Sequence, residues 1–184
     1  MRPVFEWQIG SRALHLGKRT LIMGVVNVTP DSFSDGGLHL DPEAAVAHAL
    51  QLVADGADII DIGGESTRPG AAVIASAEAG ASSSSATKIA VSEREELDRV
   101  IPVITSLKRK RSDAVISVDT YKAAVARAAV EAGAAIVNDV SGFRWDSRMA
   151  KTLAELKCGA VLMHMRGRPE EWRTLPPVAD IVVS

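Results

Sequence analysis

Residues that could bind an anion follow an apolar run in the stretch 57–70, ADIIDIGGESTRPG. Its two adjacent glycines allow the backbone to approach a ligand closely, and Thr67 and Arg68 add a hydroxyl and a guanidinium fork. These groups suit an anionic, oxygen-rich ligand. The same letters also suit an ordinary corner between a strand and a loop, in which Glu65 pairs with Arg68 at the surface. The stretch alone leaves both interpretations open.

Five apolar runs of strand length alternate with helical patterns along the chain. The expected strands are Leu21–Val28, Asp58–Gly63, Val115–Thr120, Ala134–Val140 and Val161–Met165. Three of them begin directly after a Gly-Ala pair that ends a helix, at residues 56–57, 133–134 and 159–160. Strict alternation predicts an α/β fold with a parallel sheet and right-handed crossovers.

Polar residues stand at the carboxyl end of every expected strand, namely Asn27, Asp61, Asp119, Asn138 and His164. An open doubly wound sheet places such residues at one or two strands near its switch point. A barrel directs all of its strand-end loops toward one central site. The pattern therefore favours a barrel.

Three further segments complete the expected organisation. Residues 1–20 alternate apolar and polar side chains and predict a short hairpin that closes one end of the domain. A helix is expected from the N-cap Asp41 to about Asp55. Residues 71–91 are rich in Ala and Ser and are interpreted as a mobile insertion, with another helix beginning near Ser92.

Size and composition indicate one domain, here 1–184, with 47% hydrophobic and only 4% aromatic residues. The net charge of -2, without a basic tail, argues against nucleic acid or an acidic membrane surface as the main partner. Cys158 is the only cysteine, so no disulfide framework is expected. No signal peptide or membrane span is expected either, and the prediction is a cytoplasmic protein.

Four motifs resemble the dihydropteroate synthase family in their order and strand-end context. They are GVVNV with TPDSFSDGG, then DIGGESTRPG, SVDT and VNDVSG. The resemblance implies a TIM (β/α)8 barrel, of which about five βα units are present. It also implies condensation of 6-hydroxymethyl-7,8-dihydropterin pyrophosphate with p-aminobenzoate, the need for magnesium, a homodimer when full length, and a sulfonamide target.

The resemblance assigns the floor of the pterin site to Asp119 and Asn138, whose side chains can bond the pterin amino and ring N–H groups. Asp61 is expected on the same floor, and Met163 against the pterin ring. Other roles remain open for each: a helix cap for Asp119, a strand-end turn for Asn138, an ion pair for Asp61, and plain core packing for Met163. No role is implied for His164.

The remaining implied residues serve magnesium, pyrophosphate and p-aminobenzoate. Asn27 would meet magnesium, and Thr67 would donate to pyrophosphate. Arg68 would serve either the pyrophosphate or the p-aminobenzoate carboxylate. Asp35 resembles a catalytic acid, and Phe33 and Pro69 would wall the p-aminobenzoate pocket.

The family's later motifs do not occur in these residues: an Asp on the sixth strand, a Lys segment on the seventh and an Arg-x-His segment on the eighth. We therefore expect the amino-terminal two thirds of the enzyme, with doubtful activity of the chain alone. Two alternatives are a catalytically silent pterin-binding fragment and a pterin-dependent methyltransferase-type barrel. The TPDSFSDGG motif and the Thr67-Arg68 pair argue against the methyltransferase.

Overall fold

The computed structural model describes residues 3–29, 41–65, 91–167, 171 and 174–178. Near the amino terminus, β1 (Phe5–Ile9) pairs antiparallel with β2 (Arg12–Leu16) around a turn at Gly10, whose φ is 69°. This is the predicted hairpin. Within the described ranges, no helix combines the length and apolar character needed to cross a membrane.

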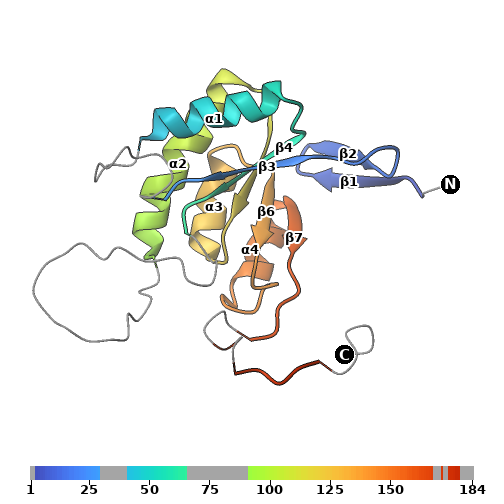
Figure 1. The fold of residues 1–184 in the computed structure, drawn as a ribbon, viewed down its shortest axis with the longest axis vertical. Coiled ribbons are helices and arrows are strands. Elements are labelled where there is room, and N and C mark those ends of the chain that lie inside the picture. The colour runs from blue at the N-terminus through green and yellow to red at the C-terminus, as the bar shows by residue number, and fades with distance from the viewer. Residues whose placement is uncertain (1–2, 30–40, 66–90, 168–170, 172–173, 179–184) are drawn as a thin grey trace, which may run out of the picture.

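A parallel sheet of five strands forms the centre of the molecule (Figure 1). Its order is β3 (Met23–Asn27), β4 (Ile59–Gly63), β5 (Val115–Asp119), β6 (Ile136–Asp139) and β7 (Gly159–Leu162). The helices between successive strands are α1 (Pro42–Ala54), α2 (Glu93–Lys110), α3 (Ala123–Glu131) and α4 (Met149–Leu156). Because neighbours in the sheet are also neighbours in sequence, this order has no switch point, as a barrel requires.

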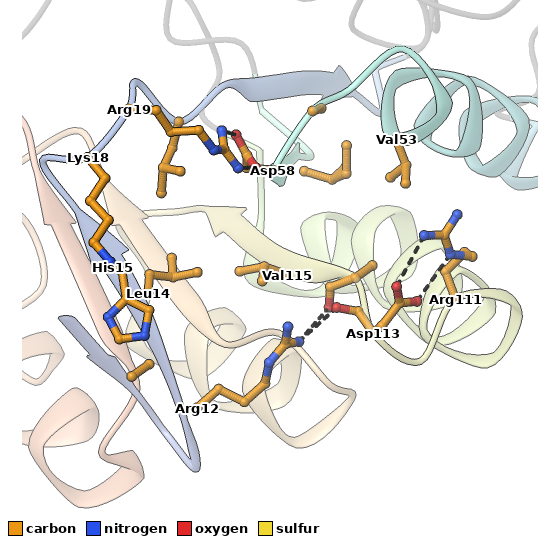
Figure 2. Close-up of a pocket in the computed structure, with 15 residues that line it drawn as sticks. Arg12, Leu14, His15, Lys18, Arg19, Val53, Asp58, Arg111, Asp113 and Val115 are labelled. Atoms are coloured by element: carbon orange, nitrogen blue, oxygen red, sulfur yellow. Dashed lines mark hydrogen bonds and ion pairs between the residues drawn. The ribbon is translucent and has the colours of Figure 1, made fainter. Parts of the chain in front are cut away.

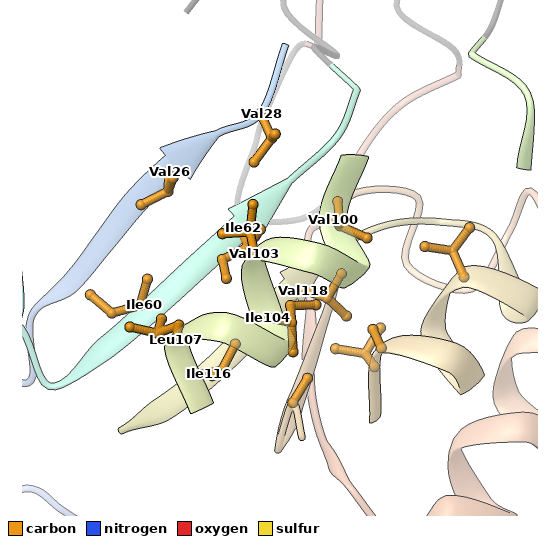
Figure 3. Close-up of a cluster of buried hydrophobic side chains, with 14 of the residues drawn as sticks. Val26, Val28, Ile60, Ile62, Val100, Val103, Ile104, Leu107, Ile116 and Val118 are labelled. Atoms are coloured by element: carbon orange, nitrogen blue, oxygen red, sulfur yellow. The ribbon is translucent and has the colours of Figure 1, made fainter. Parts of the chain in front are cut away.

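The main hydrophobic core lies between the sheet and the helices (Figure 3). Strand side chains that alternate along β3, β4 and β5 meet the apolar face of α2, and all of them are fully buried. The strand residues are Val26, Ile60, Ile62, Ile116 and Val118, and those of α2 are Val100, Val103, Ile104 and Leu107. Every second strand residue thus packs against the helices, and the intervening residues point to the opposite face of the sheet.

The hairpin covers the amino-terminal end of that other face. Ile9 packs there with Ile59, Val115 and Ile136, and the Gly10 amide donates to the Lys157 carbonyl at 3.0 Å. A Cβ on Gly159 would lie 2.6 Å from Ile9 Cγ2, so only glycine lets the hairpin approach β7 this closely. With the amino end filled by apolar side chains, the carboxyl end of the same face is left to polar ones.

The helix termini agree with the expected caps except at α4. The Asp41 side chain accepts a hydrogen bond from the first turn of α1, as expected. The Ser92 side chain does the same for α2, which begins where a helix is predicted. The prediction that a Gly-Ala pair at Gly159 ends α4 is wrong. Lys157 takes the left-handed conformation after this helix, with φ 51°, so Gly159 is free to open β7. β7 therefore begins earlier than expected and ends at Leu162.

Candidate active site

One row of the sheet brings together the predicted strand-end residues. In the register, Asn27 pairs with Gly63, Gly63 with Asp119, and Asp119 with Asn138. A Cβ on Gly63 would stand 3.5 Å from Asp119 Oδ2 and 3.8 Å from Asn27 Oδ1. Gly63 therefore forms an open floor, bordered by an amide oxygen on one side and a carboxylate on the other.

Asp61 lies one pleat below this row, on the same face of the sheet, and is only 3% exposed. Asn138 Nδ2 donates to Asp61 Oδ2 at 2.9 Å, whereas Asp61 Oδ1 has no hydrogen-bond partner within the described structure. Burial raises the pKa of Asp61, while polar contacts with Ser117 and Asn138 oppose that rise. Among the described residues Asp61 has no cationic partner, so the ion-pair alternative is not observed.

Asp119 is the most perturbed carboxyl group of the row. Burial raises its pKa to about 7, and the negative charges of Asp61, Glu96, Asp139 and Glu65 add to the effect. The helix-cap alternative is wrong, because the first amide of α3, at Ala123, donates instead to Asp146 Oδ2 at 2.9 Å. Asp119 is therefore available to a ligand.

The turn after β6 is built by the neighbour of Asn138. Asp139 is fully buried and accepts hydrogen bonds from the amides of Ser141 at 2.7 Å and Phe143 at 3.0 Å. Since Asp139 holds the turn, the turn alternative for Asn138 is also wrong. The Asn138 amide group instead connects the row to Asp61.

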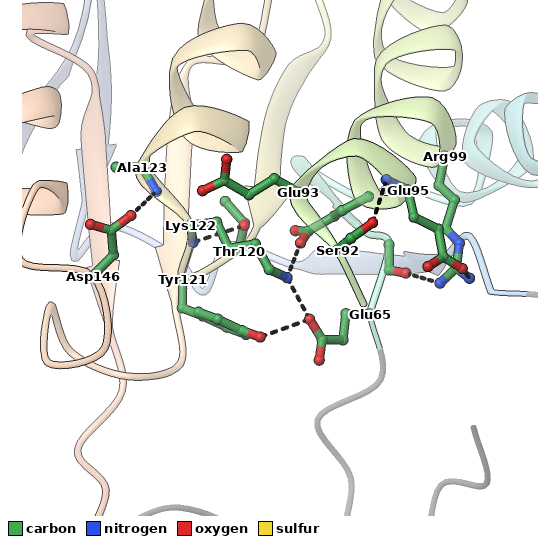
Figure 4. Close-up of polar contacts among 12 residues, drawn as sticks. Glu65, Ser92, Glu93, Glu95, Arg99, Thr120, Tyr121, Lys122, Ala123 and Asp146 are labelled. Atoms are coloured by element: carbon green, nitrogen blue, oxygen red, sulfur yellow. Dashed lines mark hydrogen bonds and ion pairs between the residues drawn. The ribbon is translucent and has the colours of Figure 1, made fainter. Parts of the chain in front are cut away.

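A buried ion cluster stands beside the row, and the sequence prediction missed it (Figure 4). Lys122 Nζ contacts Glu65 Oε2 at 2.6 Å and also bonds the Glu96 carboxylate. Tyr121 donates to Glu65 Oε2 at 3.0 Å. Glu65 is thus held by Lys122 and Tyr121, whereas Arg68, its partner in the corner interpretation, lies outside the described residues.

Two sequence signals could have pointed to this cluster. Lys122 comes two residues after the SVDT motif, so it must stand near the carboxyl end of β5. Glu96 shares the helical spacing of Val100 and Val103, which places it on the buried face of α2. A charged residue on an apolar face requires a partner, and Lys122 is that partner.

Met163 and His164 lie beyond the end of β7. Met163 is 40% exposed, so the core-packing alternative is wrong, and its amide donates to the Asp139 carbonyl at 3.2 Å. Its contact with pterin stays a prediction. His164 is exposed, and the nearby Arg166 donates to the Pro176 carbonyl at 3.1 Å, a contact within the scaffold.

The other predicted site residues fall outside the described ranges. They are Phe33, Asp35, Thr67, Arg68 and Pro69. The predicted insertion 71–91 also lies outside them except for Val91, which is buried. Their assignments stay predictions from the family resemblance.

A cleft of about 710 Å³ lies at the opposite, amino-terminal end of the strands (Figure 2). Three of its arginines already have partners. Arg19 pairs with Asp58, Arg111 pairs with Asp113, and Arg12 donates to the Asp113 carbonyl at 2.9 Å. We therefore assign the chemistry to the carboxyl end, where buried acceptors remain unused.

Comparison with known proteins identifies relatives of this chain. The family model described as pterin-binding enzyme matches residues 23–82 and 78–184. The chain is 46% identical over 163 residues to a dihydropteroate synthase of Clostridium beijerinckii, which covers 89% of this chain and 54% of that protein.

Solved structures agree with the sequence comparison. The dihydropteroate synthase of Xanthomonas albilineans with 4-aminobenzoic acid superposes with a TM-score of 0.72 at 47% identity, over 89% of this chain and 53% of that one. The same enzyme with 7,8-dihydropteroate gives 0.69 at 44% identity, over 88% and 51%. The fold is thus a partial TIM barrel. The chain spans about half the length of these relatives, not the expected two thirds.

Proposed function

This chain belongs to the family of pterin-binding enzymes, and from that premise we propose that it serves dihydropteroate synthesis. The reaction joins 6-hydroxymethyl-7,8-dihydropterin pyrophosphate to p-aminobenzoate and releases pyrophosphate. Relatives solved with 4-aminobenzoic acid and with 7,8-dihydropteroate support this choice. The observation that carries the proposal is the row Asn27–Gly63–Asp119–Asn138 above the unused acceptor of Asp61.

The row suits the hydrogen-bonding edge of a pterin. Pterin presents its amino group and ring N–H groups along one edge, and these are donors. Asp61 Oδ1 is a buried acceptor without a hydrogen-bond partner in the described structure, and the charged neighbours that raise the pKa of Asp119 are all carboxylates. Asn138 supplies an amide that can both donate and accept. A bound pterin would give the two buried carboxylates the partners that the described protein lacks.

The reaction replaces a carbon–oxygen bond by a carbon–nitrogen bond at the pterin methylene. As pyrophosphate leaves with the bonding electrons, positive charge develops on the methylene and the pterin ring. The arylamine nitrogen of p-aminobenzoate then bonds to that carbon and releases a proton. An ionised Asp119 against the pterin ring stabilises the developing positive charge. Asp35, Thr67 and Arg68 would act on the leaving group and the second substrate, and Phe33 and Pro69 would flank the latter.

Magnesium fits this site as a companion of pyrophosphate. Within the described ranges, no group of three or more His, Cys, Asp or Glu residues could hold a metal ion. Asn27 Oδ1 borders the open floor over Gly63, opposite the Asp119 carboxylate. Magnesium keeps several waters and relies on substrate phosphates, so one amide oxygen is a sufficient protein ligand. Asn27 would hold the ion, which would neutralise charge on the departing pyrophosphate.

We expect the protein to act in the cytoplasm, with its single cysteine reduced, and as a homodimer in its full-length form. Cys158 is a free, partly buried thiol. The location follows the sequence prediction and the dimer follows the family resemblance. Fractionation tests the first, and the molar mass in solution tests the second.

Calorimetric titration of the chain with a pterin analogue tests the proposal, in buffers with and without magnesium pyrophosphate. We expect pterin binding, and we expect magnesium to bind appreciably only when pyrophosphate is present. Absence of pterin binding would contradict the proposal. Pterin binding that magnesium pyrophosphate never influences would favour a pterin-dependent methyltransferase-type protein instead.

A further inference from the structure

The buried ion cluster has no part in the chemistry described above, although its charges are almost completely withdrawn from solvent. Lys122 is 8% exposed and Glu96 is 1% exposed. The Lys122 ammonium also lies 4.3 Å from the centre of the Tyr121 ring. Figure 4 shows Lys122 and Tyr121 reaching toward Glu65 from the start of α3. A charged network this deeply buried requires an explanation.

The cluster joins three parts of the fold at the carboxyl end of β4. Gly63 accepts a hydrogen bond from the Val28 amide at 2.7 Å, and Gly64 accepts one from Arg99 Nη1 at 2.6 Å. The next residue, Glu65, is held by Lys122. Three consecutive residues at the end of β4, Gly63 to Glu65, are thus fixed by the residue that follows β3, by α2 and by the connection between β5 and α3. We call this arrangement the β4 clamp.

Stability alone does not explain the clamp. Burial by itself would lower the pKa of Lys122, but the carboxylates of Glu96 and Glu65 outweigh that effect and raise it. The charges thus stabilise one another, yet well-packed apolar side chains generally serve a buried site equally well or better. What an ion cluster adds is a fixed geometry, because each carboxylate must stay within reach of the same ammonium group.

We propose that Lys122 is a positioning residue, which holds the end of β4 so that Gly63 stays level with Asn27 and Asp119. This inference rests on the proposed function, because the row it maintains is the proposed pterin site. A shift of Gly63 would change the spacing between Asn27 Oδ1 and Asp119 Oδ2, which now lie on either side of it. Lys122 therefore acts on the ligand through β4 and does not touch it.

Amide hydrogen exchange in the ligand-free chain tests the clamp directly. In Lys122→Met, the Val28 amide should exchange at least about tenfold faster than in wild type, because local opening of the β4 end exposes it. The Ala135 amide, which donates to Ile116 at 2.8 Å, is the internal reference and should change little. Lys122→Arg should restore most of the protection.

Lys110→Met is the matched control, since it removes an exposed lysine that pairs with Glu43. It should leave Val28 exchange unchanged. If Lys122→Met does not fold, Glu65→Gln replaces it, because this change keeps the volume while weakening the bond to Lys122. Unchanged Val28 exchange in the folded variant, or an equal increase at Val28 and Ala135, would overturn the proposal.

Pterin titration supplies the second readout. The folded Lys122→Met variant should bind a pterin analogue about tenfold more weakly, and Lys122→Arg should recover to within about threefold of wild type. A purely structural role would lower the melting temperature and leave this affinity unchanged. If the wild-type chain binds no pterin, the proposed function fails, and the exchange measurement still decides whether Lys122 holds β4.

Discussion

The two ends of the parallel sheet place an aspartate in opposite electrostatic surroundings. At the amino end, Asp58 accepts from Arg19 Nη1 at 2.7 Å and from the Ile22 amide at 2.9 Å. These hydrogen bonds lower its pKa to about 2. At the carboxyl end, Asp119 has carboxylates as its charged neighbours, and its pKa is raised to about 7. The pKa of an aspartate is thus lowered at one end of the sheet and raised at the other.

This difference shows at which end of the sheet the polar groups lack hydrogen-bond partners within the protein. Asp58 and Asp113 at the amino end already pair with arginines, so these carboxylates are satisfied by the protein's own side chains. At the carboxyl end, Asp61 Oδ1 has no hydrogen-bond partner among the described residues, and the charged neighbours that raise the pKa of Asp119 are all carboxylates. Unsatisfied polar groups in a fixed row are a cost in the free protein, and a ligand with matching donors removes that cost.

The largest expected effect is on the pH dependence of stability. Between pH about 4 and about 7 the folded state keeps the Asp119 proton and the unfolded state does not, so the free energy of unfolding falls as pH rises. The loss is complete above pH 7 and reaches as much as about 4 kcal/mol. Asp119→Asn should abolish it, which makes the variant more stable than wild type at pH 8 but not at pH 4. Urea unfolding at the two pH values measures this.

The next effect is on the ligand. Asp119→Ala should weaken binding of a pterin analogue by about 2–4 kcal/mol, since a charge-assisted pair of hydrogen bonds is lost. Asp58→Ala, at the other end of the sheet, is the matched control and should leave the affinity unchanged. Calorimetry measures the affinities. Equal pterin affinities for wild type and Asp119→Ala would contradict the assignment of ligand binding to the carboxyl end of the sheet.

A smaller effect is expected at the two glycines after Ile62, where stability and ligand binding should separate. A Cβ on Gly64 would lie 2.9 Å from Val100 Cγ1 and 3.0 Å from Glu96 Cγ. Gly64→Ala should therefore lower the free energy of unfolding by about 1–3 kcal/mol through overpacking. Gly63→Ala meets only ordinary contacts, so it should mainly weaken pterin binding. Thermal unfolding and titration of both variants test this separation.

The smallest effect belongs to the amino end. Asp58→Asn breaks a largely exposed ion pair, and its melting temperature at pH 7 should fall by at most about 3 °C. The folded-state pKa of Asp58 lies below its ordinary value, so its contribution is present at neutral pH and is lost as pH falls toward about 2. A melting curve at high salt should show a smaller difference. A larger loss than at Gly64→Ala would reverse the ranking of the two ends.

The sequence predicted the strand order and the residues of the row because both depend on local patterns. Apolar runs and caps such as Asp41 define the elements, and register alone then aligns Asn27, Asp119 and Asn138. The ion cluster was not predicted, because Glu65, Glu96 and Lys122 meet only through tertiary packing. The end of α4 was placed wrongly because Lys157 adopts a conformation usually taken by glycine.

The contact between Ile9 and Gly159 has a consequence for how the chain reaches this structure. The two residues lie 150 positions apart, so this contact can form only after nearly the whole parallel sheet has been assembled. Long-range contacts of this kind slow folding, because loop-closure entropy is lost before the contact forms. During synthesis the hairpin leaves the ribosome before β7, so its contact with Gly159 forms late. Until then Ile9 and Trp7 stand exposed, and this interval is when the chain is most open to association with other chains.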